Sequence, residues 1–373
     1  MLEVHVERSL RVRVPPRAPE QAHVKTNLFN YPLPERLIAQ HPADRRGTEK
    51  MLVLHRDGGI IEHRHIADIA EYMTSDDLLV VNDTKVFPAR LIGRWPDTGG
   101  AVELLLVSPN PEGGWNCLVG SGRKCREGQE ALFGPHDELK AVLKRPLEGL
   151  GAWLCGFESA RPLMELLDEF GKTPVPPYVR REGTPEEERE DRERYQTIYA
   201  KNTGSVAAPT AGLHFTEEIF KSLDEKGVRR TAITLHVGPG TFRPVKSENI
   251  EDHHMDFEAF EVSPEAADEI NACKARGGRV FCTGSTTVRT LETVAAANGG
   301  KVVPGAGASD IFIYPPYDFK VCDAMLTNFH LPKSTLLMMV SALAGRERIL
   351  CAYAMAVRAN YMFFSYGDCM LIV

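Results

Sequence analysis

Apolar runs and amphipathic segments alternate along the second half of the 373-residue chain. A helix is predicted to begin at Pro264, because Ser263 is a suitable N-cap, and to end at the glycine pair 277–278. A second helix is expected after Gly284 and a third after Pro332. Strands rich in apolar residues are expected before, between and after these helices, at 230–237, 279–283 and 323–329. This alternation predicts an α/β domain with a mainly parallel sheet.

The middle of the chain has a different pattern, in which turn sequences such as DTGG, NPEGG and EGQ separate short apolar runs. Short strands at regular spacing are typical of a small β-barrel or sandwich, and we expect a barrel inserted into the α/β domain. The runs are DLLVVN (77–82), ARLIG (89–93), AVELLLV (101–107), WNCLVG (115–120), EALFG (130–134) and LKAVLKR (139–145).

These patterns predict a discontinuous α/β domain comprising 25–75 and 158–373, with a barrel domain at 76–157. The basic, proline-containing segment 1–24 is expected to be a disordered leader. The charged segment 181–196 is typical of a solvated helix or a loop. The apolar run at the carboxyl end predicts a last strand that closes the α/β sheet.

The composition is that of an ordinary globular protein, with 43% hydrophobic and 25% charged residues and a net charge of −7. No apolar run is long enough to span a membrane. The eight cysteines form no Cys-x-x-Cys pair, which argues against zinc ribbons and iron–sulfur clusters. Cytosolic reduced thiols are expected. A cytoplasmic monomer without membrane contact or an obligate protein partner is the working expectation.

Three histidines, His214, His236 and His330, each follow a predicted strand in surroundings of small and polar residues. Ligands of open α/β sheets bind at the carboxyl ends of strands, so a shared cleft is predicted. Two other interpretations stay open. Each histidine can be a hydrogen-bonded structural residue, or the three can form a metal site.

Other polar groups lie at turns and helix starts. Gly238 and Gly240 flank Pro239 in a turn that exposes backbone N–H groups, which suits an anion or a ribose. A helix start at 285–287 is suited to a carboxylate or phosphate, with Arg289 as a charged partner, unless Arg289 pairs with Glu292 on the helix surface. Further candidates at strand ends, at a domain junction and at the last helix start are Asn82, Asp83, Arg90, Lys333 and Ser334.

Long phrases of the chain resemble the S-adenosylmethionine:tRNA ribosyltransferase-isomerase family of queuosine biosynthesis, in the same order, from about residue 25 to the end. These phrases are FNYPLPERLIAQHPADRRGTEKMLVL (29–54), DLLVVNDTKVFPARL (77–91), GSVAAPTAGLHFT (204–216), LHVGPGTFRPV (235–245), TTVRTLET (286–293), TNFHLPKSTLLMMVSALAG (327–345) and FFSYGD (363–368). The family's fold is an α/β domain that carries an inserted β-barrel.

The resemblance implies transfer and isomerisation of the ribosyl part of S-adenosylmethionine onto 7-aminomethyl-7-deazaguanine at the wobble position of tRNA. The implied products are epoxyqueuosine in tRNA, adenine and methionine. S-Adenosylmethionine is then a consumed substrate, and no metal or other cofactor is implied. Positively charged sulfur acidifies the neighbouring C5′ hydrogens, so the reaction needs proton transfer, for which histidine is suited at neutral pH.

On this interpretation His214 and His236 transfer protons near the sugar. The remaining candidates bind substrate: Thr210 and Gly212 at the sugar, Gly238 and Gly240 in the glycine turn, Ser285, Thr286, Thr287 and Arg289 at the methionine carboxylate, and Asn82, Asp83, Arg90, His330, Lys333 and Ser334 around the same cleft.

Two positions depart from the family pattern: Asp256 where a second histidine is usual in Asp-His-x-Met-His-x-Glu, and Met362 where an arginine is usual.

The expected tRNA contacts are basic residues of the barrel, because phosphates dominate RNA affinity. Arg123, Lys124 and Arg126 cluster in GSGRKCREG (120–128). Without the resemblance, two other function classes fit the residues. One is a metal-dependent hydrolase that uses the three histidines, and the other is an RNA-binding protein without catalysis.

Overall fold

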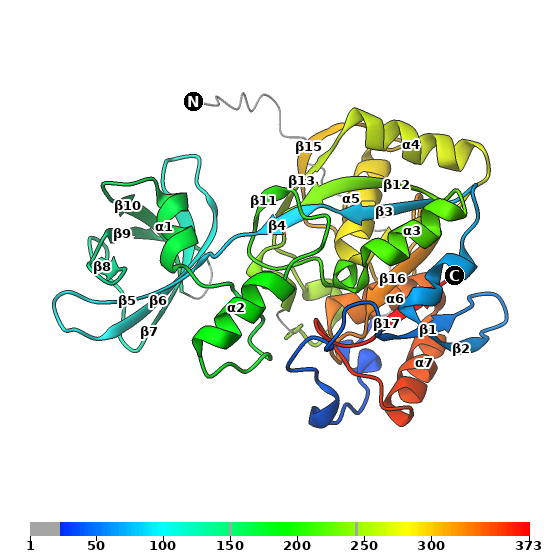
Figure 1. Cartoon of the computed structure of the whole chain (residues 1–373), viewed down its shortest axis with the longest axis horizontal. Helices are drawn as coiled ribbons and strands as arrows, with labels where there is room; N and C mark the ends of the chain where they lie inside the picture. The colour runs from blue at the N-terminus through cyan, green and yellow to red at the C-terminus, as the bar shows by residue number, and fades with distance from the viewer. Residues whose placement is uncertain (1–22, 149–150, 243–244) are drawn as a thin grey trace. The chain divides into compact units, whose positions relative to one another are not determined.

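The computed structural model describes residues 23–148, 151–242 and 245–373, and the chain divides into two compact units (Figure 1). The first contains residues up to 84 together with 197–201 and 209–373, and the second contains 85–196 and 202–208. The expected α/β domain with an inserted barrel is confirmed. All but the last two residues of the predicted leader 1–24 lie outside the described residues.

The structure moves both limits of the predicted barrel, 76–157. The run 77–82 is a strand of the α/β sheet, because both of its faces are buried there. The segment after 157 stays with the barrel, because Leu166 and Leu167 of helix α1 pack into the barrel core. The predicted solvated helix at 181–196 is α2, and it belongs to the same unit.

The first unit is built on a nine-stranded sheet among the described residues, in the order β15-β13-β12-β3-β14-β16-β17-β1-β2. The four central strands β12, β3, β14 and β16 are parallel, and β13 and β15 add antiparallel pairs on one side. The other side combines antiparallel and parallel pairs, so the sheet is mixed and not mainly parallel as predicted. The strands are β1 (Lys50–Leu54), β2 (Ile61–His65), β3 (Leu78–Asn82), β12 (Arg229–Leu235), β13 (Glu258–Val262), β14 (Val280–Thr283), β15 (Gly305–Ser309), β16 (Ala324–Asn328) and β17 (Cys369–Ile372).

The predicted last strand, β17, lies between β16 and β1, so the chain ends inside the sheet as expected. It pairs parallel with β1 and antiparallel with β16. The helices of this unit are α3 (Glu217–Glu225), α4 (Pro264–Ala275), α5 (Gly284–Ala297), α6 (Thr335–Ala344) and α7 (Arg346–Arg358), and its 3₁₀ turns include η3 (Ile66–Tyr72), η4 (Thr210–His214), η5 (Pro239–Phe242) and η6 (Ile250–Asp252).

Both faces of the sheet are buried. On one face, side chains such as Leu79 and Val81 pack in a core cluster with Ile219 and Phe220 of α3 and with η3. The alternate residues of β3, Leu78 and Val80, are also fully buried and lie on the opposite face. That face carries α5, whose Thr286 is hydrogen-bonded to the side chain of Asn82.

The second unit contains a closed barrel in the order β10-β7-β6-β5-β8-β9, with all neighbours antiparallel. Alternate residues of β6, such as Leu104 and Leu106, are buried inside it. Its elements are β5 (Arg90–Arg94), β6 (Ala101–Pro109), β7 (Trp115–Ser121), β8 (Glu130–Phe133), β9 (Leu139–Pro146), β10 (Ala152–Glu158), α1 (Leu163–Phe170) and α2 (Pro185–Arg194), and the short strands β4 (Thr84–Val86) and β11 (Asn202–Ser205) form a separate pair.

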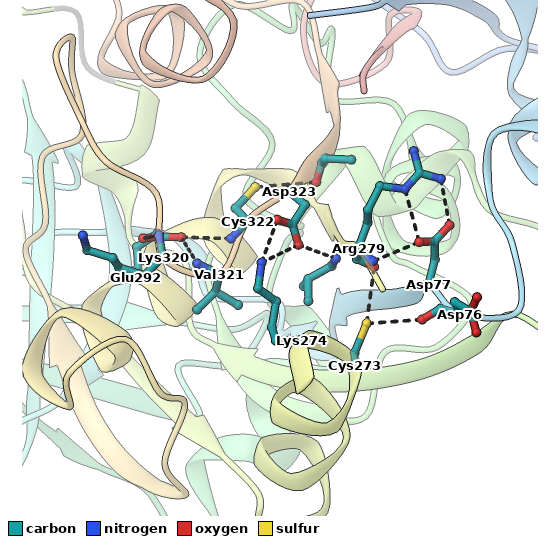
Figure 2. A network of polar contacts seen from close by, with 12 residues as sticks. Asp76, Asp77, Cys273, Lys274, Arg279, Glu292, Lys320, Val321, Cys322 and Asp323 are labelled. Carbon is teal, nitrogen blue, oxygen red and sulfur yellow. Dashed lines mark hydrogen bonds and ion pairs between the residues drawn. The ribbon is translucent and has the colours of Figure 1, made fainter. Parts of the chain in front are cut away.

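The amino ends of the parallel strands are fixed by a polar network, shown in Figure 2. Asp77, before β3, accepts hydrogen bonds from the backbone and the guanidinium of Arg279, before β14. Asp323, before β16, accepts from Lys274 of α4 and from the N–H of Val280. These carboxylates hold the starts of the strands in register, so the amino edge of the sheet stabilises the fold.

Asn82, a predicted substrate-binding residue, instead links three elements at the other edge. Its side chain is fully buried and makes four hydrogen bonds: Nδ2 donates to the carbonyl of Leu235 (2.9 Å) and to Thr286 Oγ1 (3.1 Å), and Oδ1 accepts from the N–H groups of Leu235 (3.0 Å) and Thr84 (3.1 Å). Because the amide of Asn82 makes these hydrogen bonds inside the protein, the residue has a structural role.

Replacing Asn82 with alanine should therefore destabilise the protein strongly. The change leaves buried backbone groups of Leu235 and Thr84 without partners, and we expect a loss of about 3 kcal/mol in the free energy of unfolding. Urea unfolding followed by circular dichroism measures it. The control is Asn298→Ala at the exposed end of α5, where a loss below about 1 kcal/mol is expected. Equal losses in the two variants would contradict the assignment.

Candidate functional site

The carboxyl ends of the four parallel strands share one edge of the sheet, and several predicted site residues follow these ends. His236 directly follows β12, and Gly284 begins α5 directly after β14. His330 lies two residues after β16. The structure thus brings these chain segments to the edge at which α/β proteins bind ligands.

His214 reaches this edge from η4 and not from a strand of its own. Its side chain is only 2% exposed, and its Nε2 accepts a hydrogen bond from Asn328 Nδ2 at the end of β16 (3.1 Å). The same amide nitrogen donates to the carbonyl of Phe364, which fixes the orientation of the amide. The ring proton of His214 is therefore on Nδ1.

Nδ1 of His214 faces Glu49, whose Oε1 lies 3.8 Å away, farther than a hydrogen bond. Burial alone would raise the pKa of Glu49, but the neighbouring imidazole and backbone N–H donors hold this pKa below its usual value. His214 and Glu49 form a buried polar pair. Sequence reasoning missed Glu49 because it is more than 160 positions away in the chain.

The small residues beside His214 serve close packing. A Cβ atom on Gly212 would lie 2.1 Å from the hydroxyl of Tyr199, so this position requires glycine. Gly212 is buried in the core, whereas Thr210, at the start of η4, is partly exposed. The side of Gly212 on which a side chain would lie is filled by Tyr199, and its predicted place in a sugar pocket stays a prediction.

His236 is partly exposed and hydrogen-bonded through Nδ1 to Thr84 Oγ1 at 2.8 Å. Burial lowers its pKa, while the charges of Asp83 and Glu261 oppose this shift. Asp83 accepts a hydrogen bond from Thr234 Oγ1 at 2.6 Å and is partly exposed. Asp83 thus lies close enough to His236 to oppose the effect of burial on its pKa.

His330 is buried, and its Nε2 is hydrogen-bonded to Thr327 Oγ1 at 2.8 Å. Burial lowers its pKa to about 3, so the ring is neutral at pH 7. Ser334 is the N-cap of α6, since its Oγ accepts from the N–H of Leu337 (3.2 Å). Lys333 has φ of 59°, in the left-handed region, and its N–H donates to the carbonyl of Phe29. These hydrogen bonds hold β16 and the start of α6 in place, and the one from Lys333 comes from its backbone.

The start of α5 is also largely occupied by internal contacts. Thr287 Oγ1 donates to the carbonyl of Thr283 (2.8 Å), and Thr286 Oγ1 accepts from Asn82, whereas Ser285 is partly exposed. A turn further along, Arg289 is buried and forms an ion pair with Glu258 of β13. The alternative pairing of Arg289 with Glu292 is wrong, because Glu292 is fully buried among backbone N–H groups of 320–322 (Figure 2).

A cavity of about 560 Å³ lies beside the Arg289–Glu258 pair, within the first unit. The turn after β12 contributes to its walls: the N–H of Gly238 donates to Glu258 Oε1 (3.0 Å), and a Cβ on Gly240 would lie 1.9 Å from Asp256 Oδ2. The lining residues are Gly240, Lys246, Ser247, Asp252, His253, His254, Met255, Asp256, Glu258, Arg289 and Thr335.

Most of this lining comes from a segment that the sequence analysis did not count among the site residues. The Asp-His-x-Met-x-x-Glu part of the family pattern was the available signal, and the departure at Asp256 obscured it. Of the predicted site residues, Gly240 and Arg289 line the cavity, whereas His214, His236 and His330 are absent from its lining. The side chain of Asp256 itself belongs to the site.

The three predicted histidines do not form a metal site. Each has a ring nitrogen bonded to a different partner, Asn328, Thr84 or Thr327. In the part of the chain that the structure describes, no three His, Cys, Asp or Glu side chains are grouped as metal ligands. The ligand set that the metal-dependent hydrolase hypothesis requires is therefore not found among the described residues.

The predicted tRNA-binding residues lie in the second unit. Arg123 is held by Asp97 through two hydrogen bonds of 2.9 Å and lies over the ring of Trp95, 4.6 Å from its centroid. Lys124 and Arg126 are exposed. Arg90, predicted at the junction, forms an ion pair with Glu103 of the barrel at 2.7 Å. Lys124 and Arg126 are thus the more accessible cations of this segment.

A family model described as "Queuosine biosynthesis protein" matches residues 26–372. The chain belongs to this family. A Moorella thermoacetica protein named S-adenosylmethionine:tRNA ribosyltransferase-isomerase is 50% identical over 345 residues, which cover 92% of this chain and 98% of the relative. The crystal structure of S-adenosylmethionine tRNA ribosyltransferase from Thermotoga maritima is 36% identical, with a TM-score of 0.52 and coverage of 93% of this chain and 100% of that chain.

Both similar proteins match this family member over nearly its whole length, so the resemblance read from the sequence is confirmed. None of the helices in the described ranges is both long and apolar enough to cross a membrane.

The buried His330 predicts an acid-sensitive contribution to stability. The unfolded chain takes up a proton at this residue near pH 6.5, whereas the folded chain does so only near pH 3. Acidification therefore favours the unfolded state, and about 2 kcal/mol should be lost between pH 7 and pH 5 from this residue alone. Urea unfolding at both pH values measures the loss.

His330→Gln isolates this contribution, because other groups that titrate in this range are shared by both proteins. The variant should lose about 2 kcal/mol less than the parent between the two pH values. The same pH dependence in parent and variant would show that His330 is not held neutral by burial.

Proposed function

We propose that this chain is an S-adenosylmethionine:tRNA ribosyltransferase-isomerase. It transfers and isomerises the ribosyl part of S-adenosylmethionine onto 7-aminomethyl-7-deazaguanine at the tRNA wobble position, forms epoxyqueuosine and releases adenine and methionine. The observation that carries the proposal is the 50% identity to the Moorella thermoacetica enzyme across 98% of that protein. Such a tRNA substrate also implies action in the cytoplasm, and the monomeric state stays a prediction.

We assign the substrate S-adenosylmethionine to the cavity beside Arg289. Its volume of about 560 Å³ lies in the usual range for small-molecule sites. The lining combines the cations of Lys246 and Arg289 with the carboxylates of Asp252, Asp256 and Glu258, and Arg289 and Glu258 are paired with each other. This mixture suits a ligand that carries one carboxylate together with an ammonium and a sulfonium group. S-Adenosylmethionine is consumed as a substrate in this proposal.

The reaction sets distinct tasks for the chain. A base must remove a proton from C5′ beside the sulfonium, a proton must reach the departing adenine, and the amine must be held close to the opened sugar. Holding the reactants in place is worth about 7–11 kcal/mol, and proton transfer about 10²- to 10⁴-fold in rate. For His236 we retain the proposed role in proton transfer, because its side chain is partly exposed at the sheet edge. His214 fits a positioning role better, because its ring is buried and bonded to Asn328.

The primary test mixes purified protein, S-adenosylmethionine and an anticodon stem-loop that bears 7-aminomethyl-7-deazaguanine, without added metal. Mass spectrometry should detect epoxyqueuosine, free adenine and methionine together. The control stem-loop carries guanine, which lacks the aminomethyl nucleophile. Binding of the RNA without any product would favour the non-catalytic RNA-binding hypothesis, and a metal requirement would reopen the hydrolase hypothesis.

The barrel cations give a separate prediction about tRNA. Lys124→Glu/Arg126→Glu should raise the KM for the stem-loop about tenfold or more, because two phosphate contacts become repulsive. Binding of S-adenosylmethionine, measured by calorimetry, should stay unchanged. Arg123 is left intact in this test, because its contacts with Asp97 and Trp95 would mix folding with binding.

Lys221→Glu/Lys301→Glu is the matched control, since it changes the net charge equally at two other exposed lysines. A similar rise of KM in both double variants would mean that net charge, and not the barrel segment, governs RNA binding.

A further inference from the structure

His253 differs from the three histidines that the sequence singled out, because it lines the cavity. It directly follows η6, and its N–H donates to the carbonyl of Ile250 (3.1 Å). This hydrogen bond fixes the position of the His253 backbone, from which the side chain extends. The residue is partly buried, so the ring has both protein and open space around it.

The imidazole plane is held by an aromatic contact. The ring meets Phe312 edge-on, with centroids 5.3 Å apart and an angle of 74° between the planes. Phe312 is in turn packed against Tyr314, with centroids at 4.9 Å. An edge-on contact is a favourable aromatic geometry, and it orients the ring without using its nitrogens.

The ring nitrogens of His253 have no hydrogen-bond partner among the described residues, and neither is a fully buried atom. His214, His236 and His330 each use a ring nitrogen for a bond inside the protein. His253 and the exposed His254 are therefore the histidines of this lining whose ring nitrogens are available to a molecule in the cavity, and His253 is the one that is partly buried and oriented by an aromatic contact.

The surroundings of His253 favour the neutral ring, which is the form that can accept a proton. Burial and the neighbouring His254 lower its pKa, whereas Asp256 opposes the shift, so the ring is neutral at pH 7 and able to accept a proton. The other charged groups that line the cavity are Lys246, Asp252, Glu258 and Arg289. Asp256 can stabilise the imidazolium that forms.

We propose that His253 is the residue that removes the C5′ proton from the sulfonium substrate in this cavity. The C5′–H bond breaks, its electron pair stays on the carbon beside sulfur, and the proton moves to an imidazole nitrogen. When the bond between C1′ and adenine breaks, its electron pair leaves with adenine, and the imidazolium returns the proton to an adenine nitrogen. This assignment rests on the proposed function, since it needs S-adenosylmethionine as the substrate.

The test compares the full-length parent protein with His253→Ala and His253→Gln. We expect kcat to fall by about 10²- to 10⁴-fold in both variants, with the dissociation constant of S-adenosylmethionine within about threefold of the parent value. Added imidazole should restore part of the activity of His253→Ala, because a free base can enter the space left by the ring. Thermal unfolding shows whether each variant is folded, and His253→Gln retains size and polarity if the alanine variant unfolds.

The pH profile separates proton transfer from a structural role. Because a neutral ring is needed, the kcat/KM of the parent should fall on acidification, with a midpoint below the usual histidine value of about 6.5. This acidic limb should be absent from His253→Gln. The control is His136→Ala, an exposed histidine of the barrel, which should retain the parent rate and profile.

Each result decides between the assignments. A parent protein that makes no product overturns the proposed function and this assignment with it. An active parent with equally active folded variants overturns the role of His253 alone. Loss of substrate binding in proportion to the loss of kcat would also overturn it, because His253 would then be a binding residue. Retained binding, rescue by imidazole and a lost acidic limb together support it.

Discussion

The buried ion pair between Arg289 and Glu258 is the interaction on which the cavity depends. Both side chains are almost fully removed from water, where unpaired charges are very unfavourable. Glu258 also accepts from the N–H of Gly238, and Arg289 donates to the carbonyl of Ser309. Four segments, α5, β13, β15 and the turn after β12, are thereby joined at one point. The cavity wall is rigid there because neither charge can leave its partner at low cost.

The two edges of the parallel strands have different tasks. At the amino edge, the carboxylates of Asp77 and Asp323 accept hydrogen bonds from backbone and basic groups, so they serve the fold (Figure 2). At the carboxyl edge, strands end in loops and helix starts, and polar groups of distant segments gather. This division is general for parallel sheets, because all the strands begin at one edge of the sheet and end at the opposite edge.

The histidines illustrate how burial divides similar residues into different roles. His330 and His214 are buried and bonded to neighbours, so they help to define the fold around β16. Among the described residues, His253 is held by its backbone and by Phe312, so its nitrogens can serve chemistry. The small and polar residues around His214 and His330 suggested a ligand cleft, whereas His253 lies in the charged run EDHHMD (251–256), so the local composition did not reveal which histidine has available nitrogens.

The sequence by itself determined the family, the α/β class, the inserted barrel and the cap at Ser263, because these depend on local periodicity and on long matching phrases. From the sequence alone, β3 is assigned to the barrel, because the apolar pattern of a buried strand is the same in a barrel and in an α/β sheet. Only the tertiary structure decided that Asn82 and Gly212 are structural, that Arg289 pairs with Glu258 and that segment 246–256 lines the cavity. The physical reason is that hydrogen bonds, ion pairs and cavities join residues far apart in the chain, and their partners are fixed only when the strands take their order in the sheet.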